Sequence, residues 1–130
     1  MAVLFTNNTD TQMRNHGFIR AAAAVPCVRI ADTGFNTEEI CRSAEEAFVK
    51  EASLVVFPEL SVTGSSCGDL ISQSMMTDSA ENGIKKILEF SRGKAMTMVI
   101  GAPVPYRSRL YNCAIVIRNG NIKGIVPKTY

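Results

Sequence analysis

The chain has 130 residues, about the size of one domain, and 46% of them are hydrophobic against 20% charged, an ordinary balance for a globular protein. The formal net charge is only +2, and Lys and Arg are scattered without an aromatic platform, which argues against nucleic-acid binding. No apolar run approaches the roughly 20 residues that a membrane-spanning helix needs, so we expect no membrane segment.

Residues 1–15 are predicted to form a flexible N-terminal tail, because they are polar after Phe5 and show no periodicity. Arg20 interrupts the only apolar candidate for a signal peptide, so we expect no secretory leader and a cytoplasmic location. The rest of the chain, residues 16–130, shows no repeat and no linker and is predicted to belong to one domain.

The predicted strands of the first half are short and apolar. Residues 18–25 predict a buried strand that ends at Pro26, and residues 28–30 are a candidate extension of it. Residues 54–57 are apolar and rich in β-formers, a pattern that predicts a strand buried on both faces.

Two amphipathic helices are predicted between and after these strands. Asn36 is the expected N-cap of the first, because Glu39 follows it at the spacing of a capping box. Asp78 is the expected cap of the second, which Gly83 weakens slightly. The residues expected to face the core recur at helical spacing and are Ile40, Ala44, Ala47, Phe48, Ala80, Ile84, Ile87 and Leu88.

The last third of the chain predicts three further strands, at residues 95–102, 110–117 and 122–126. The first of these is expected to stop at Pro103 and Pro105. Asn119-Gly120 separates the other two and favours a type I′ hairpin turn, which needs positive φ at both central residues.

The predicted order is β-α-β-α-β-β-β, which indicates an α/β fold with a mixed sheet and helices on one face. Nothing in the sequence covers the second face of that sheet, whereas a complete α/β domain usually has both faces covered. We therefore expect either part of a domain or a domain that pairs sheet to sheet with a partner.

Four cysteines are spread along the chain and form neither a CxxC pair nor a zinc-type spacing with the only histidine, His16. We therefore expect no metal site. Two disulfides are an alternative, but the length and composition favour reduced, mostly buried thiols. The four are Cys27, Cys41, Cys67 and Cys113.

Two charged residues are candidates for chemistry, because each directly follows a proline at the end of a predicted strand. They are Glu59, after Pro58, and Lys128, after Pro127. Ligands of open α/β sheets bind outside the carboxyl ends of strands. If the two ends lie close together, the carboxylate can take a proton and the ammonium can stabilise an oxyanion. On spacing alone, a solvated loop or cap residue remains the alternative for Glu59.

Six short motifs follow one another along the chain: HGFIR (16–20), VVFPELSVTG (55–64), SCGDL (66–70), GAP (101–103), LYNCA (110–114) and GIVPKTY (124–130). Their order resembles that of the nitrilase, or carbon–nitrogen hydrolase, superfamily over residues 16–130. SCGDL is the most specific, because it resembles the N-terminal glutaminase domain of glutamine-dependent NAD synthetases more than nitrilases at large.

The resemblance implies an α-β-β-α sandwich and a Glu-Lys-Cys triad. In that triad Glu59 matches the general base, and Lys128 matches the lysine that supports the tetrahedral intermediate. The nucleophilic cysteine of the family follows a later strand, beyond the lysine, and none of the four cysteines matches it. The resemblance therefore implies that residues 16–130 are the N-terminal part of a glutaminase domain with an incomplete triad, inactive alone.

In the resembled enzymes, ammonia released from glutamine passes to a synthetase domain that uses ATP and Mg to amidate deaminated NAD. An SGGxDS-type pyrophosphatase loop is absent from this sequence, so we expect no cofactor in this chain. The resemblance also implies glutamine as the small-molecule substrate of the intact domain and a homo-oligomeric intact enzyme.

One residue departs from the family pattern. A tyrosine usually follows Thr-Gly, but Ser65 stands here and offers neither a ring wall nor the same reach. This difference leaves two alternatives open. The first is another carbon–nitrogen hydrolase acting on a different amide or nitrile, and the second is a non-catalytic α/β remnant that acts through its sheet face.

Overall fold

The computed structural model describes residues 2–5, 17–68 and 74–129. Within them the chain forms six strands and two helices. In chain order these are β1 (Ala2–Phe5), β2 (Ala21–Val25), α1 (Thr33–Val49), β3 (Leu54–Val56), α2 (Ser74–Ser91), β4 (Thr97–Tyr106), β5 (Arg109–Arg118) and β6 (Asn121–Pro127).

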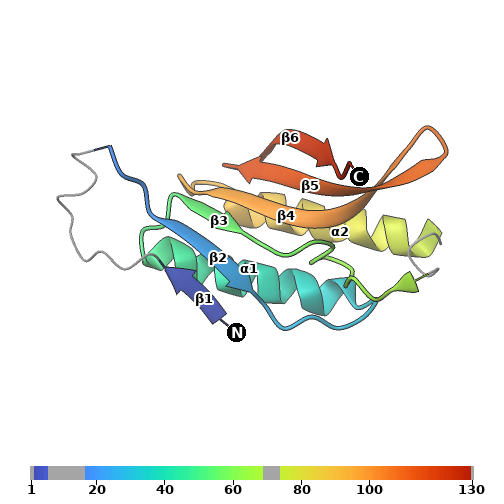
Figure 1. Cartoon of the computed structure of the whole chain (residues 1–130), viewed down its shortest axis with the longest axis horizontal. Coiled ribbons are helices and arrows are strands. Elements are labelled where there is room, and N and C mark those ends of the chain that lie inside the picture. The colour runs from blue at the N-terminus through green and yellow to red at the C-terminus, as the bar shows by residue number, and fades with distance from the viewer. Residues whose placement is uncertain (1, 6–16, 69–73, 130) are drawn as a thin grey trace.

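The strands form one sheet in the order β1-β2-β3-β4-β5-β6 (Figure 1). Strands β2, β3 and β4 are parallel, and each of the two connections between them contains a helix. The outer pairs, β1 with β2, β4 with β5 and β5 with β6, are antiparallel. The sheet is therefore mixed, as the sequence predicted.

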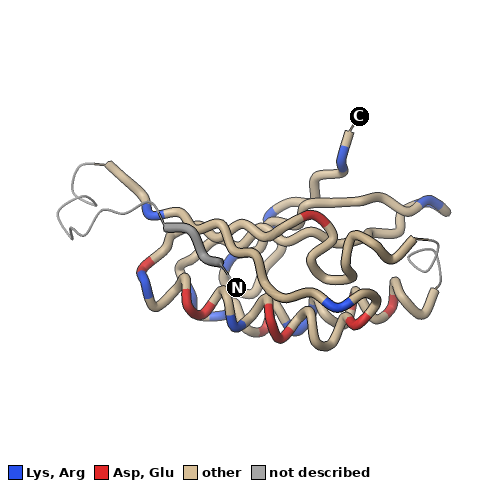
Figure 2. Tube along the Cα trace, turned by 60° about the horizontal axis from the view of Figure 1, so that its bottom comes forward, with Lys and Arg blue, Asp and Glu red and all other residues tan. Residues whose placement is uncertain are grey.

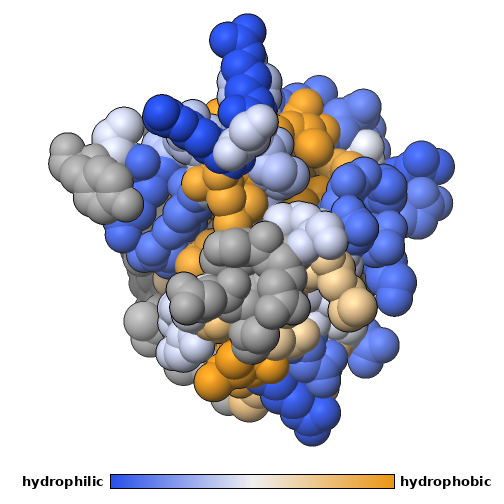
Figure 3. All heavy atoms as spheres, turned by 90° about the vertical axis from the view of Figure 1, so that its right-hand side faces the viewer, coloured by the Kyte–Doolittle hydropathy of each residue, from blue (hydrophilic) through white to orange (hydrophobic). Residues whose placement is uncertain are grey.

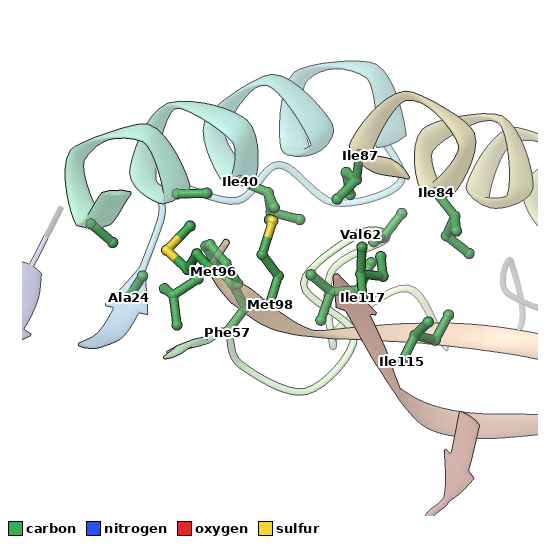
Figure 4. Close-up of a cluster of buried hydrophobic side chains, with 14 of the residues drawn as sticks. Ala24, Ile40, Phe57, Val62, Ile84, Ile87, Met96, Met98, Ile115 and Ile117 are labelled. Atoms are coloured by element: carbon green, nitrogen blue, oxygen red, sulfur yellow. The ribbon is translucent and has the colours of Figure 1, made fainter. Parts of the chain in front are cut away.

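Both helices pack on the same face of the sheet, and the core lies between them and the strands (Figures 1 and 4). Ile40 of α1 and Ile87 of α2 are fully buried there, against Met98 of β4 and Ile117 of β5. Charged residues lie mainly along the helices (Figure 2). The predicted core faces of both helices are confirmed, although Phe48 and Leu88 are only partly buried.

The opposite face of the sheet is open in the described part of the chain. On β2 and β3 the alternation leaves Val25 54% exposed and Val56 40% exposed. The prediction that the β3 strand is buried on both faces was therefore wrong, because helices cover only one side. The apolar open face continues onto β6 at Val126, which is 57% exposed and pairs with Ala114, next to the buried Cys113 and Ile115.

Helix α1 begins earlier than predicted, because Asp32 rather than Asn36 is its N-cap. The Asp32 side chain accepts a hydrogen bond from the Phe35 backbone N–H at 3.0 Å. Asn36 lies inside the helix and is completely buried. Its side chain bonds both backbone groups of Arg29 and the carbonyl of Val62, so it anchors two loops instead of starting the helix.

Helix α2 also begins earlier, at Ser74, so Asp78 lies within it and does not cap it. Gly83 lies where α2 packs closely against α1. A Cβ at this position would come within 2.6 Å of Thr37 Oγ1 on α1, so glycine allows the two helices to approach closely.

The prediction that strand β4 stops at the prolines was wrong. The strand continues through Pro103 and Pro105 to Tyr106. Alternate residues before them direct their backbone groups away from β5: Val99 O accepts from Phe57 N, and Gly101 O accepts from Val62 N. Pro103 and Pro105 continue this alternation beyond the last residue of β3. Their missing N–H groups therefore cost the sheet no hydrogen bond.

The N-terminal segments differ from the prediction in two places. Ala2–Phe5 form β1 on the edge of β2, in the segment expected to be a tail, and residues 6–15 lie outside the described residues. Strand β2 begins only at Ala21, and residues 28–30 do not extend it. The β5–β6 hairpin is confirmed, because Asn119 and Gly120 both have positive φ, 48° and 75°.

Candidate functional site

Glu59 and Lys128, which are 69 residues apart in the sequence, form an ion pair at one end of the sheet. Lys128 Nζ donates to Glu59 Oε1 at 3.1 Å and to Oε2 at 3.3 Å. The two side chains are about half exposed, 52% for Lys128 and 51% for Glu59. The two strand ends therefore lie close together, which is the condition that the sequence left open for this pair of charges.

The backbone of Glu59 is held by β4. After β3, the chain turns at Pro58 and runs across Gly101, which has no side chain to keep it away. A Cβ on Gly101 would come within 2.6 Å of Pro58 O. Ser61 Oγ accepts from Gly101 N at 3.2 Å, and Val62 N donates to Gly101 O at 3.1 Å. These contacts fix the turn that presents Glu59.

Lys128 is placed by the end of the β5–β6 hairpin. Pro127 is the last residue of β6 and pairs with Cys113. One residue further, Lys128 N donates to Asn112 O at 2.8 Å, so the backbone pairing continues to the lysine itself. The hairpin register therefore determines where the ammonium group lies.

Asn112 is the third member of the site and was not predicted from the sequence as a functional residue. Its Nδ2 donates to Glu59 Oε1. Asn112 belongs to the LYNCA motif, but the motif alone does not indicate on which face of β5 its side chain lies. The buried alternation Cys113, Ile115, Ile117 is the signal that places Asn112 on the opposite, open face.

The pKa of the Glu59 carboxyl is lowered from its ordinary value. The main cause is the hydrogen bond from Lys128, followed by the bond from Asn112 and the charge of Lys128; partial desolvation acts in the opposite direction. Both neighbours are donors that stabilise the carboxylate form. Glu59 is therefore ionised at neutral pH and able to accept a proton.

A pocket of about 330 Å³ surrounds the ion pair and is lined by the ends of β3 and β6, the residues that follow them, and interior residues of β4 and β5. The polar side chains in its lining are Glu59, Asn112 and Lys128, beside apolar residues such as Val99 and Val126. Figure 3 shows the right-hand side of the molecule of Figure 1 in space-filling form, where hydrophobic surface lies between hydrophilic residues.

All four cysteines are free thiols, and none is placed to attack a group held by the ion pair. Cys113 belongs to the pocket lining, but its side chain shares the buried face of β5 with Ile115, and burial raises the pKa of its thiol. Cys67 is buried and donates to Thr63 O at 2.8 Å. Burial raises the pKa of Cys41 to about 11, and the exposed Cys27 does not line the pocket.

The structure contains no metal-type cluster of three or more His, Cys, Asp or Glu side chains among the residues it describes. His16 and Asp69, from two of the motifs, lie outside the described residues. Neither described helix is long and apolar enough to cross a membrane.

The fold and the site together define an α/β protein of the nitrilase type, with a carboxylate and an ammonium group at the strand ends of one sheet. The chain belongs to the carbon–nitrogen hydrolase family, because the pattern of that family, "Carbon-nitrogen hydrolase", matches residues 20–130.

Relatives and solved structures agree with this assignment. The glutamine-dependent NAD(+) synthetase of Mycobacterium tuberculosis is 36% identical over 115 residues, which are 88% of this chain and 17% of that protein. The crystal structure of a glutamine-dependent NAD(+) synthetase from Cytophaga hutchinsonii superposes with a TM-score of 0.81 at 27% identity, over 86% of this chain and 19% of that one.

An amidase from Nesterenkonia sp. shares the fold, with a TM-score of 0.73 at 21% identity, over 86% of this chain and 43% of the amidase. The resemblance to nitrilase-type proteins and the α/β fold with helices on one face are thus confirmed. The chain spans only about a fifth, or less, of the length of the NAD synthetases it matches.

Proposed function

We propose that this chain contributes the base and the cation of a glutamine-hydrolysing site, as the N-terminal part of the glutaminase domain of a glutamine-dependent NAD synthetase. The observation that carries the proposal is the Glu59–Lys128 ion pair in its pocket. The relatives support glutamine as the substrate, because those that match this chain are named glutamine-dependent NAD synthetases.

The chemistry requires three roles. A thiolate attacks the side-chain amide of glutamine, a base takes the thiol proton, and a cation stabilises the oxyanion of the tetrahedral intermediate. Glu59 is ionised and half exposed, so it fits the base. Lys128 lies within 3.3 Å of both Glu59 oxygens, so its charge would be available to a carbonyl bound beside Glu59.

The nucleophile is the group that this chain does not supply. Cys113 belongs to the pocket lining, but its side chain lies on the buried face of β5, and Cys27, Cys41 and Cys67 do not line the pocket. The proposal therefore assigns to the chain positioning, proton transfer and charge stabilisation, and assigns the attacking thiol to a segment beyond residue 130.

A chimeric enzyme tests this function directly. Residues 20–130 replace the matched segment of the Mycobacterium tuberculosis relative, and NAD formation is measured with glutamine and, separately, with ammonia. We expect both nitrogen sources to be used. Glu59→Gln or Lys128→Met should reduce the glutamine-supported rate by at least about 100-fold, since each removes a group that acts in the transition state.

The ammonia-supported rate is the internal control, because it does not need the glutaminase site. It should stay unchanged in both variants, and Lys123→Met, on the same strand β6, should leave both rates unchanged. A chimera that uses ammonia normally but never glutamine would count against the proposal. That result would favour a different amide or nitrile substrate, for which Ser65 provides the structural reason.

A further inference from the structure

Asn112 contacts both members of the ion pair through different groups. Its side-chain Nδ2 donates to Glu59 Oε1, and its backbone carbonyl accepts from Lys128 N at 2.8 Å. Glu59 follows β3 and Lys128 follows β6, whereas Asn112 belongs to β5. One residue of a well-paired strand therefore links two chain segments that the sequence places far apart.

The two oxygens of Glu59 have different surroundings. Oε1 accepts from both Asn112 Nδ2 and Lys128 Nζ, while Oε2 accepts only from Lys128 Nζ, at 3.3 Å, among the described residues. An amide NH₂ group donates hydrogen bonds but does not accept them, because its lone pair is delocalised into the carbonyl. Asn112 therefore disfavours protonation of Oε1 and leaves Oε2 as the oxygen with capacity for a proton.

We propose that Asn112 is a positioning residue for this site, which holds the Glu59 carboxylate by Oε1 so that Oε2 is the atom that receives the proton. The inference rests on the proposed function for its catalytic meaning, but the contact itself does not. When the base acts, the S–H bond of the attacking thiol breaks, its electron pair stays on sulfur, and an O–H bond forms at Oε2.

The lowered pKa of Glu59 agrees with this role, because the bond from Asn112 is among its causes, after the bond from Lys128. A donor to the carboxylate keeps the base ionised in the resting state. A residue that only filled space on the open sheet face would not have this effect on the titration of Glu59.

A titration of Glu59 by NMR in the 130-residue chain tests the inference without glutamine. The side-chain carboxyl resonance is followed with pH in the wild type, in Asn112→Ala and in Asn82→Ala. Asn82 is an exposed asparagine on α2, which packs on the face of the sheet opposite the ion pair. Its variant is therefore the matched control for loss of an amide. We expect an upward shift of the Glu59 pKa in Asn112→Ala and none in Asn82→Ala.

A second measurement needs no variant, so it decides the matter if Asn112→Ala does not fold. In the wild type, the side-chain N–H resonances of Asn112 should shift with pH at the same midpoint as the Glu59 carboxyl. Identical Glu59 titrations in folded wild type and Asn112→Ala, or Asn112 resonances that ignore that midpoint, would overturn the proposal.

The chimera adds an activity readout that separates the two proposals. With glutamine, Asn112→Ala should reduce kcat and move the acidic limb of the pH profile to higher pH, following the Glu59 titration. If the NMR shifts occur but the chimera never uses glutamine, the contact stands and the proposed function fails. If glutamine is used but Asn112→Ala changes neither titration nor profile, only the positioning role fails.

Discussion

The Glu59–Lys128 ion pair should make stability depend on pH in a direction that its geometry fixes. The pKa of Glu59 is lower in the folded chain than its ordinary value of 4.5. The pair therefore stabilises the folded chain above that value, and this stabilisation is lost as the pH falls through the lowered pKa. Lys128→Met should unfold at lower urea concentration than the wild type at pH 7, and the difference should disappear in acid.

Lys123→Met is the control for this prediction, since Lys123 lies on β6 outside the Glu59 ion pair. Its difference from the wild type should not vary with pH in this range. A Lys128→Met difference that is constant from pH 7 to acid would show that Lys128 acts through packing and not through charge. The side chains of Glu59 and Lys128 are both about half exposed, so high salt should weaken the stabilisation by their ion pair.

Glu59 and Lys128 were predictable as residues because a proline precedes each at the end of an apolar run. Asn112 was not, because a residue in the middle of a strand has two faces and the sequence of β5 alone does not say which one meets the ion pair. Its role depends on the register with β6, and that register is a property of the folded sheet.

Gly101 should be intolerant of substitution because the Glu59 turn packs directly on its backbone. In Gly101→Ala the added Cβ would contact Leu60 N and come within 2.6 Å of Pro58 O, both backbone atoms that cannot rotate away. We expect a loss of about 1–3 kcal/mol in the free energy of unfolding, the usual cost of overpacking, measured by urea denaturation. The displaced turn should also weaken the Glu59–Lys128 contact.

Gly124→Ala is the matched control, because a Cβ on Gly124 of β6 would meet no atom within 4 Å. It should change the free energy of unfolding little. Equal losses in the two variants would mean that the cost comes from replacing any glycine of a strand, and not from a clash with the turn that carries Glu59.

The types of element were predictable from the periodicity, but their ends were not. Several residues that can cap a helix occur close together in the sequence, and tertiary contacts determine which of them is the cap. Asp32 is the N-cap of α1, whereas the side chain of Asn36 bonds Arg29 and Val62 in two loops. The continuation of β4 through Pro103 likewise depends on where the neighbouring β3 ends.

At the scale of the whole molecule, the order of elements predicted a sheet with helices on one face, and the open apolar face follows from it. That face carries the pocket around the ion pair, since Val56 and Val126 contribute to its lining and are both exposed. The site is therefore built on the side of the sheet that no described element of this chain covers. Any group that reaches the ion pair from outside the described residues would have to approach from that side.

The placement of the four thiols leads to the last prediction, that the purified 130-residue chain releases no ammonia from glutamine. The thiolate, not the thiol, is the nucleophile, and burial raises the pKa of Cys41 and Cys113, which disfavours their thiolate forms. The side chain of Cys113 also lies on the buried face of β5, opposite the face that carries the ion pair. A coupled ammonia assay should give the same background for the wild type and Glu59→Gln. Glu59-dependent ammonia release by the chain alone would show that a thiol reaches the pocket after all, and Cys→Ser variants would then identify which one.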